Sequence, residues 1–260
     1  MVMRRWGTVI LGLVFLLTVL SFFYTPYRPE QIQISRRLQP PSRLHFFGTD
    51  HLGRDIFSRL LVGGRVSLLI GVGAVLLGAV GGIVLGMAAG FVGNFVDELV
   101  MRVSDGMQSL PSILLALLFA TVWQPGPVVI LWAIAVGNIP IFLRLTRNQV
   151  LSIKKRPYVE AAQALGNGSG GIIWRHILPN IKDALIVQFS VSLAGAILAE
   201  SSLSYLGVGI QPPHPSWGGM LREAQAYASM APWLVVVPGL AIGLTVIGFN
   251  LLGSGWTNGR

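Results

Sequence analysis

The sequence predicts an all-α, polytopic membrane protein with about six transmembrane helices. Only 11% of the 260 residues are charged and 53% are hydrophobic, whereas about 25% of the residues in a typical soluble domain are charged. The charged residues also leave several long stretches free of any charge. A soluble core of this size needs a polar coat that this composition does not supply, so most of the outer surface must face lipid.

The uncharged stretches locate the helices. We expect them at about 6–23, 66–96, 102–123, 127–147, 181–203 and 232–252. The stretch 106–143 has 38 uncharged residues, too many for one crossing, and Pro125-Gly126-Pro127 in its middle predicts a turn. The first stretch follows Arg4-Arg5 as in a signal peptide, but no small-residue cleavage site follows it, so we expect a retained helix.

Basic residues suggest the orientation. Arg4 and Arg5 indicate a cytoplasmic start, and six crossings then place both termini and the segment 144–182, with its seven Lys and Arg residues, in the cytoplasm. The loop 24–65 also carries seven arginines and would be external, but the rule weakens for loops of this length. We divide the chain into an N-terminal helix with an external loop, 1–65, and a transmembrane domain, 66–260.

Four glycines of the second expected helix, Gly78, Gly82, Gly86 and Gly90, fall on one helix face. Such a pattern lets two helix backbones approach closely. We expect it to serve packing within the chain rather than a subunit interface.

The segment 157–182 predicts a short helix, a glycine-rich turn at 166–171 and a second short helix over 172–178 that Pro179 ends. It lies between the fourth and fifth expected crossings and is too short to be a domain. Its small residues Ala161, Ala162 and Gly166 would allow the surface of another protein to approach. The alternative is an ordinary loop that joins two crossings.

The order Glu160-Ala161-Ala162, Gly166 and Leu178-Pro179 resembles the EAA loop of ATP-binding-cassette importer permeases, although His176 stands where the general pattern has Ile. Two further segments, Gly48 to Arg59 and Leu203 to Gly218, are similar to the second permease subunit of dipeptide, oligopeptide and nickel importers. The resemblance covers about 44–253, and the last residues, 253–260, lack the charged tail usual in such permeases.

The resemblance implies a type I ABC importer permease fold in the bacterial inner membrane. It implies a second homologous permease, two cytoplasmic ATPase subunits and an external solute-binding protein as partners. It assigns the ATPase-coupling surface to Glu160, Ala161, Ala162, Gly166, Leu178 and Pro179. The implied cargo is di- or oligopeptides, with nickel or a nickel chelate as the alternative.

The chain itself is not expected to be an enzyme. It has no GxxxxGK[ST] motif to hold ATP phosphates, so ATP is expected to be hydrolysed by the partner subunits, and no cofactor is expected. A further alternative is an ATP-independent secondary transporter. Such a carrier has no use for a docking segment, and the inverted repeat with broken helices that would favour it is not visible.

Other polar residues suggest contacts or structural roles. Asp50, Arg54, Asp55 and Trp217 are candidates for contact with the binding protein. The alternative for this part of the chain is an interfacial amphipathic stretch, in which apolar residues face lipid and arginines face headgroups. That alternative concerns Ile56, Leu60 and Leu61 on the apolar side and Arg54, Arg59 and Arg65 on the basic side.

Two carboxylates fall within or near expected crossings, where such groups are costly. We expect structural roles for both, with Asp105 paired to Arg102 on its own helix and Glu200 near the external interface. The four histidines, His45, His51, His176 and His214, have no metal-ligand spacing and are expected to be solvated loop residues. The chain has no cysteine, which excludes disulfides and thiolate ligands.

Overall fold

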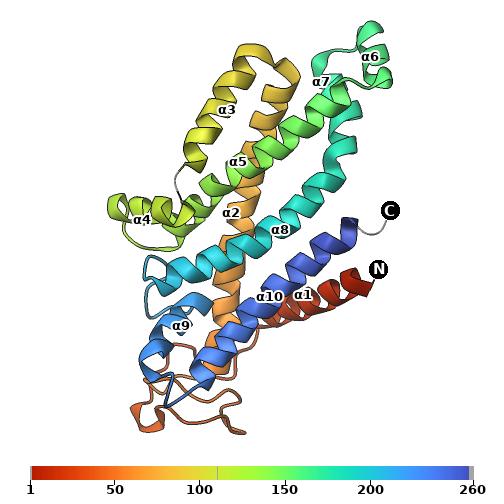
Figure 1. Ribbon diagram of the computed structural model, residues 1–260. Coiled ribbons are helices and arrows are strands. Elements are labelled where there is room, and N and C mark those ends of the chain that lie inside the picture. The colour runs from red at the N-terminus through yellow and green to blue at the C-terminus, as the bar shows by residue number, and fades with distance from the viewer. Residues whose placement is uncertain (1, 110, 258–260) are drawn as a thin grey trace.

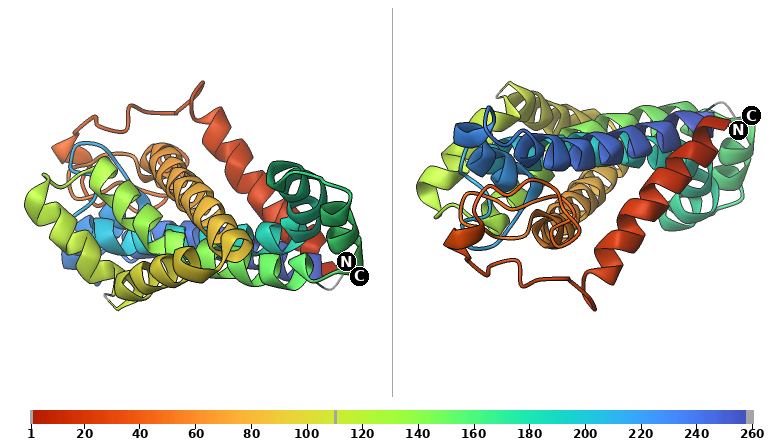
Figure 2. Two further views of the ribbon diagram at one scale, coloured as in Figure 1. Left: turned by 90° about the horizontal axis from the view of Figure 1, so that it is seen from above. Right: turned by 90° about the horizontal axis from the view of Figure 1, so that it is seen from below.

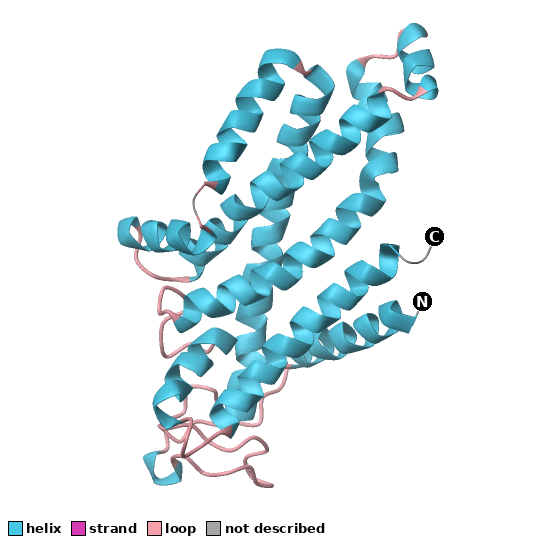
Figure 3. Cartoon of the chain, in the orientation of Figure 1, coloured by secondary structure: helices cyan, strands magenta, loops and turns pink. Residues whose placement is uncertain are grey.

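A computed structural model describes residues 2–109 and 111–257, so the end of segment 253–260 lies outside the described residues. The regular elements of this part are helical, which confirms the predicted class (Figure 3). They are α1 (Val2–Leu20), η1 (Ile34–Arg36), α2 (Ile56–Val92), α3 (Asn94–Gln108), α4 (Ser112–Val122), α5 (Pro127–Lys154), α6 (Pro157–Ala164), α7 (Ser169–Ile172), the π-helical η2 (Ile173–Ile177), α8 (Leu178–Tyr205), α9 (Trp217–Ala224), η3 (Gln225–Tyr227) and α10 (Trp233–Thr257).

Five helices of the described chain are long and apolar enough to cross a membrane, and α3 with α4 makes a sixth if the pair counts as one crossing. The expected single helix over 102–123 is wrong, because α3 and α4 lie at 86° to each other. Pro111 precedes α4 with an extended backbone. A proline lacks the N–H that a residue inside a helix donates, which explains a break at this position.

The helix α2 begins ten residues earlier than the expected start at residue 66. Its 37 residues give a length of about 55 Å at ~1.5 Å per residue. It runs from the long loop at the bottom of Figure 1 to the top and crosses α5 and α8 on the way. The expected start at residue 66 is wrong because charged residues were taken to lie outside the helix. Arg59 and Arg65 lie inside it.

The glycine stripe of α2 faces α5, so the expectation of packing within the chain is confirmed. A Cβ atom at Gly78, Gly82 or Gly86 would lie 2.5–2.6 Å from a backbone oxygen of α5. No side chain larger than hydrogen fits there without a shift of one helix. Close contact of the two backbones therefore fixes how α2 and α5 cross.

The two ends of the helix bundle differ in character (Figures 1 and 2). The start of α1 and the end of α10 lie on the same side of the bundle as α6 and α7 in both views of Figure 2. The long loop 21–55 and α9 lie at the opposite end, and we call them together the cap. The boundary at residue 65 falls within α2, between these two ends.

Candidate functional site

The helix α6 confirms the expected short helix after residue 157, and it rests on a small core of its own. Val159 and Ala162 are buried and form its inner face. Val159 packs with Val150 and Ile153 of α5 and with Ile172 of α7. The helix is therefore seated directly on the end of a long membrane helix.

The outer face of α6 is open. Tyr158, Ala161 and Leu165 are exposed at a spacing of three and four residues, with Leu165 83% exposed, and Glu160 is exposed beside them. Trp174, on the following helical segment, is 70% exposed. Tyr158, Leu165 and Trp174 were missed in the sequence, although the helical spacing of the first two with Ala161 carried the signal. These exposed apolar side chains make this end of the molecule a candidate surface for another protein.

Gly166 ends α6 through its backbone conformation. Its φ is +79°, and a Cβ atom there would meet nothing within 4 Å. The amide of Asn167 donates to the carbonyl of Ala162 at 3.2 Å, and the amide of Gly166 donates to that of Gln163 at 3.0 Å. This pair of bonds is the Schellman ending of a helix, which favours glycine at this position.

Pro179 does not end a helix, and that expectation is wrong. Residues Ser169–Tyr205 form one apolar helical run, in which Pro179 occupies the first turn of α8. The π-helical segment η2 precedes it, and the amide of Leu178 donates to the carbonyl of Ile173. The wider turn accommodates a proline that would otherwise crowd the previous turn. Leu178 is half-buried against the core beneath α6, and Pro179 is exposed.

Ion pairs join α5 to α3 near this end. Arg147 Nη2 donates to Asp97 Oδ2 at 2.6 Å, and Arg144 Nη2 donates to Asp105 Oδ1 at 2.5 Å. The expected Asp105–Arg102 pair is wrong, because Arg102 bonds instead to Glu98 one turn away at 3.0 Å. Asp105 faces α5 rather than its own helix neighbour.

Lys154, the last residue of α5, reaches α2. Its ammonium donates to the carbonyl of Phe91 at 2.7 Å and lies 5.2 Å from the centre of that ring. With the two α3–α5 ion pairs, this contact joins the ends of α2, α3 and α5. The seat of α6 is thus a group of helices held together by polar contacts.

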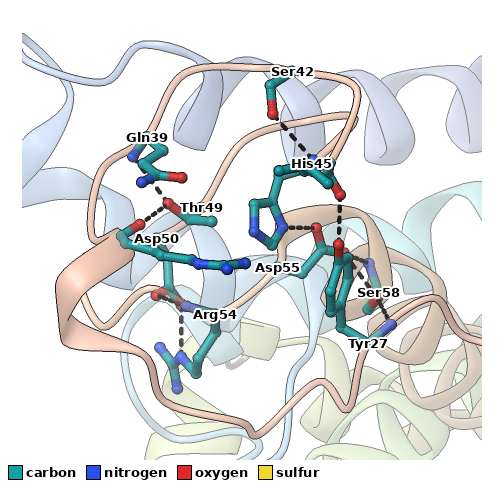
Figure 4. A network of polar contacts seen from close by, with 11 residues as sticks. Tyr27, Gln39, Ser42, His45, Thr49, Asp50, Arg54, Asp55 and Ser58 are labelled. Atoms are coloured by element: carbon teal, nitrogen blue, oxygen red, sulfur yellow. Dashed lines mark hydrogen bonds and ion pairs between the residues drawn. The ribbon is translucent and has the colours of Figure 1, made fainter.

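At the opposite end, a tight turn organises the cap (Figure 4). Asp50 Oδ1 accepts from the amides of Leu52 and Arg54, at 2.8 and 2.9 Å, and Arg54 Nε donates to Asp50 Oδ2 at 2.6 Å. Gly53, with φ +76°, completes the turn, and its absent side chain makes room for the backbone of Gln33.

Glu223 of α9 connects this turn to the membrane helices. Its Oε2 accepts from Arg54 and from Arg59 of α2, at 2.5 and 2.9 Å. Asp50, Arg54, Arg59 and Glu223 thus form a charge-balanced cluster that joins the loop, α2 and α9, and we call it the cap cluster. The ligand atoms of Asp50, His51 and Glu223 lie within 4.8 Å of one another. The two guanidinium groups on these carboxylates account for their close approach.

Asp55 forms a second buried junction. Its Oδ2 caps α2 by accepting from the amide and the hydroxyl of Ser58, at 2.8 and 2.7 Å. Its Oδ1 lies 2.9 Å from His45 Nδ1, and the His45 ring lies against Tyr27 (Figure 4). The expectation that His45 is solvated is wrong, since it is 3% exposed. His51 is half-buried and stacks on Tyr227.

The four candidates for contact with a binding protein, Asp50, Arg54, Asp55 and Trp217, are at most 5% exposed. Trp217 Nε1 donates to the carbonyl of Leu60 at 3.0 Å, and its ring covers Gly64. These side chains shape the cap from within. The amphipathic alternative is wrong, because Ile56 and Arg59 are buried as well. The exposed arginines of the cap are Arg28, Arg37 and Arg43 in the loop and Arg222 in α9.

Glu200 is fully buried in α8, five residues before the end of that helix. Its carboxylate accepts from the hydroxyls of Ser204 at 2.9 Å and Ser201 at 3.4 Å. The structural role expected for Glu200 agrees with these contacts. His176, near α6, lies beside the Tyr158 ring, and His214 pairs with Glu30 on the cap surface at 2.9 Å.

A family model described as binding-protein-dependent transport system inner membrane component matches residues 82–258. The chain belongs to this family. It is 41% identical to the dipeptide transport system permease protein DppC of Alkalihalophilus pseudofirmus, with 96% of this chain and 82% of the relative covered. It is 40% identical to the glutathione transport system permease protein GsiD of Pectobacterium atrosepticum, over 97% of this chain and 86% of the relative.

A solved structure of the MetNI methionine ABC transporter, in an inward-facing conformation, shares the fold. Its TM-score to this chain is 0.60 at 18% sequence identity, with 76% of this chain and 96% of the other covered. The resemblance drawn from the three motifs is therefore confirmed. The chain is a multi-pass membrane component of an ABC importer, a class that works with ATPase and solute-binding partners.

Proposed function

We propose that this chain is one of two permease subunits of an ATP-driven importer of di- and oligopeptides in the bacterial inner membrane. Relatives named for dipeptide and glutathione transport support the cargo class over nickel. Two ATPase subunits bind on the cytoplasmic side and a solute-binding protein binds at the cap. Both termini are cytoplasmic, and this chain neither hydrolyses ATP nor holds a cofactor.

The observation that carries the proposal is the exposed outer face of α6 on a rigid seat. Tyr158, Ala161 and Leu165 present a small apolar surface next to the Glu160 carboxylate. When the ATPases close on ATP, they displace this surface. The core beneath α6 passes the displacement to α5 and to the continuous α7–α8 run. The polar contacts of α5 with α3 and of Lys154 with α2 extend it to the rest of the bundle.

Glu160→Ala tests this proposal in the full complex, reconstituted in vesicles with its binding protein. We expect peptide uptake and peptide-stimulated ATP hydrolysis to fall about tenfold, since a hydrogen bond to a charged group contributes about 1.5–3 kcal/mol. The amount of assembled complex should not change, because Glu160 is exposed. Glu98→Ala, another exposed helical glutamate far from α6 in the sequence, is the matched control.

Normal uptake by the Glu160→Ala complex would refute the role of the α6 surface. Uptake of a nickel chelate in place of dipeptides would refute the cargo. Transport by the chain without any ATPase would refute the importer mechanism altogether.

A further inference from the structure

A cavity of about 300 Å³ lies between α4, α5 and α8. This is the lower end of the range for small-molecule sites, about 300–1,000 Å³. Its lining extends from Ala133 to Ile141 on α5 and from Gln188 to Leu203 on α8. These stretches correspond to about 12 and 22 Å of helix, so the cavity is a groove along the two helices. Figure 1 shows that α5 and α8 run beside each other.

Three uncharged polar side chains interrupt the apolar lining. Asn138 Nδ2 donates to the carbonyl of Ile134 at 2.9 Å, and Gln188 Nε2 donates to Ser192 Oγ at 3.1 Å. Their amide oxygens and the Ser192 hydroxyl leave further hydrogen-bonding capacity at the groove. Among the described residues that line it, none is charged. Polar side chains within membrane helices are costly unless they have a partner or a function.

Small residues keep the groove open. Gly195 lies in the interior of α8, where glycine is less favourable than alanine by about 1 kcal/mol. A Cβ atom there would meet nothing within 4 Å, and its φ is not positive. Neither close packing nor backbone conformation within this chain therefore requires glycine. This distinguishes Gly195 from the α2 stripe, where each glycine touches α5.

We propose that this groove is the share of the peptide path that this subunit contributes, and that Asn138, Gln188 and Ser192 contact the passing peptide. The inference rests on the proposed function and deepens it. Side-chain amides and a hydroxyl donate to and accept from peptide bonds, which every peptide carries whatever its sequence. A lining without charge neither holds nor repels particular side chains, so binding stays weak enough for release.

A helix of the second permease is the competing occupant, because amide side chains also hydrogen-bond between membrane helices. The two occupants differ in whether they let water reach the groove. A transport path must be wetted during the cycle, whereas a packed helix excludes water from the same side chains.

The absence of cysteine from this chain makes the difference measurable. We would place single cysteines by Gln188→Cys and Ser192→Cys, in a full complex whose other subunits also lack cysteine. The control is Ile186→Cys, an exposed residue two positions before Gln188 that does not line the groove. The complexes, in vesicles with binding protein and ATP, are treated with a charged, water-soluble methanethiosulfonate.

We expect the two groove cysteines to react at least tenfold faster than Ile186→Cys, and a saturating dipeptide to slow them severalfold. A second pair of variants tests blockage. Gly195→Leu fills the groove and should reduce dipeptide uptake at least tenfold in a complex that still assembles. Gly239→Leu changes a glycine of α10 whose Cβ position is equally open, and it should leave uptake unchanged.

Groove cysteines that react no faster than Ile186→Cys would overturn the inference in favour of a packed helix. Normal uptake by the Gly195→Leu complex would overturn it as well. Either result, with dipeptide uptake intact in the unmodified complex, leaves the proposed function standing. Failure of the unmodified complex to import dipeptides refutes the proposed function, and the inference with it.

Discussion

The cap and the α6 end both carry motifs of the same family, yet the motif side chains are buried at the cap and exposed at α6. At the cap, the motif side chains Asp50, Arg54 and Asp55 are buried. Arg54 donates to Asp50 and to Glu223 of α9, whereas Asp55 accepts from Ser58 of α2. At the α6 end, Glu160 and Ala161 are exposed above a small apolar core. Motifs of one family therefore lie buried at one end of this molecule and exposed at the other.

Two glycines with nearly the same backbone φ show the same contrast between a packed cap and an open α6 end. Gly53 and Gly166 have φ of +76° and +79°. A Cβ atom at Gly53 would lie 1.8 Å from the carbonyl oxygen of Gln33, whereas one at Gly166 would meet nothing within 4 Å. The cap is packed around its turn, while the space beside the end of α6 is open.

The largest expected effect is that of Asp50→Ala in the cap cluster. It leaves Arg54 and Arg59 buried beside a single carboxylate, and removal of one partner from a buried ion cluster costs about 3–5 kcal/mol. We expect a clear fall in the thermal midpoint of the purified complex in detergent. Arg102→Gln is the matched control in an exposed pair, worth about 0–1 kcal/mol. Equal effects of the two variants would mean that the cap cluster does not hold the cap together.

The next effect comes from placing alanine at the two glycines. Gly53→Ala must displace the backbone of Gln33, so we expect a loss above about 3 kcal/mol, within the range typical of severe substitutions. Gly166→Ala adds only the strain of a left-handed backbone, about 1–2 kcal/mol. Thermal unfolding of both complexes measures the difference. Equal losses would show that backbone strain alone decides, and that packing around Gly53 adds nothing.

Sequence reasoning recovered the helical class, the family and the short helix of α6, because uncharged stretches and motif spacing are local signals. It misplaced the start of α2, since Arg59 is neutralised by Glu223, which lies 164 positions away. It paired Asp105 with Arg102 on the same helix, whereas the partner Arg144 lies on α5. Burial of His45 likewise depends on Asp55 and Tyr27 across the folded loop. The burial and pairing of a charged residue cannot be predicted from its sequence neighbours when its partner is distant in the sequence.

Leu165→Ser is expected to have the smallest effect on stability. It should nevertheless weaken ATPase binding strongly. Leu165 is 83% exposed, and surface substitutions of this kind change stability by at most about 0.5 kcal/mol. If its side chain is buried against an ATPase, its loss removes about 1.5–3 kcal/mol of apolar contact, which weakens ATPase binding by about tenfold or more. Binding of the purified ATPase to the reconstituted permease pair measures this directly. Leu44→Ser, at a similarly exposed leucine of the cap, should change neither quantity. Unchanged ATPase binding in the Leu165→Ser complex would mean that the exposed face of α6 is not the contact surface. The two ends would then differ in burial but not in a known role in ATPase binding.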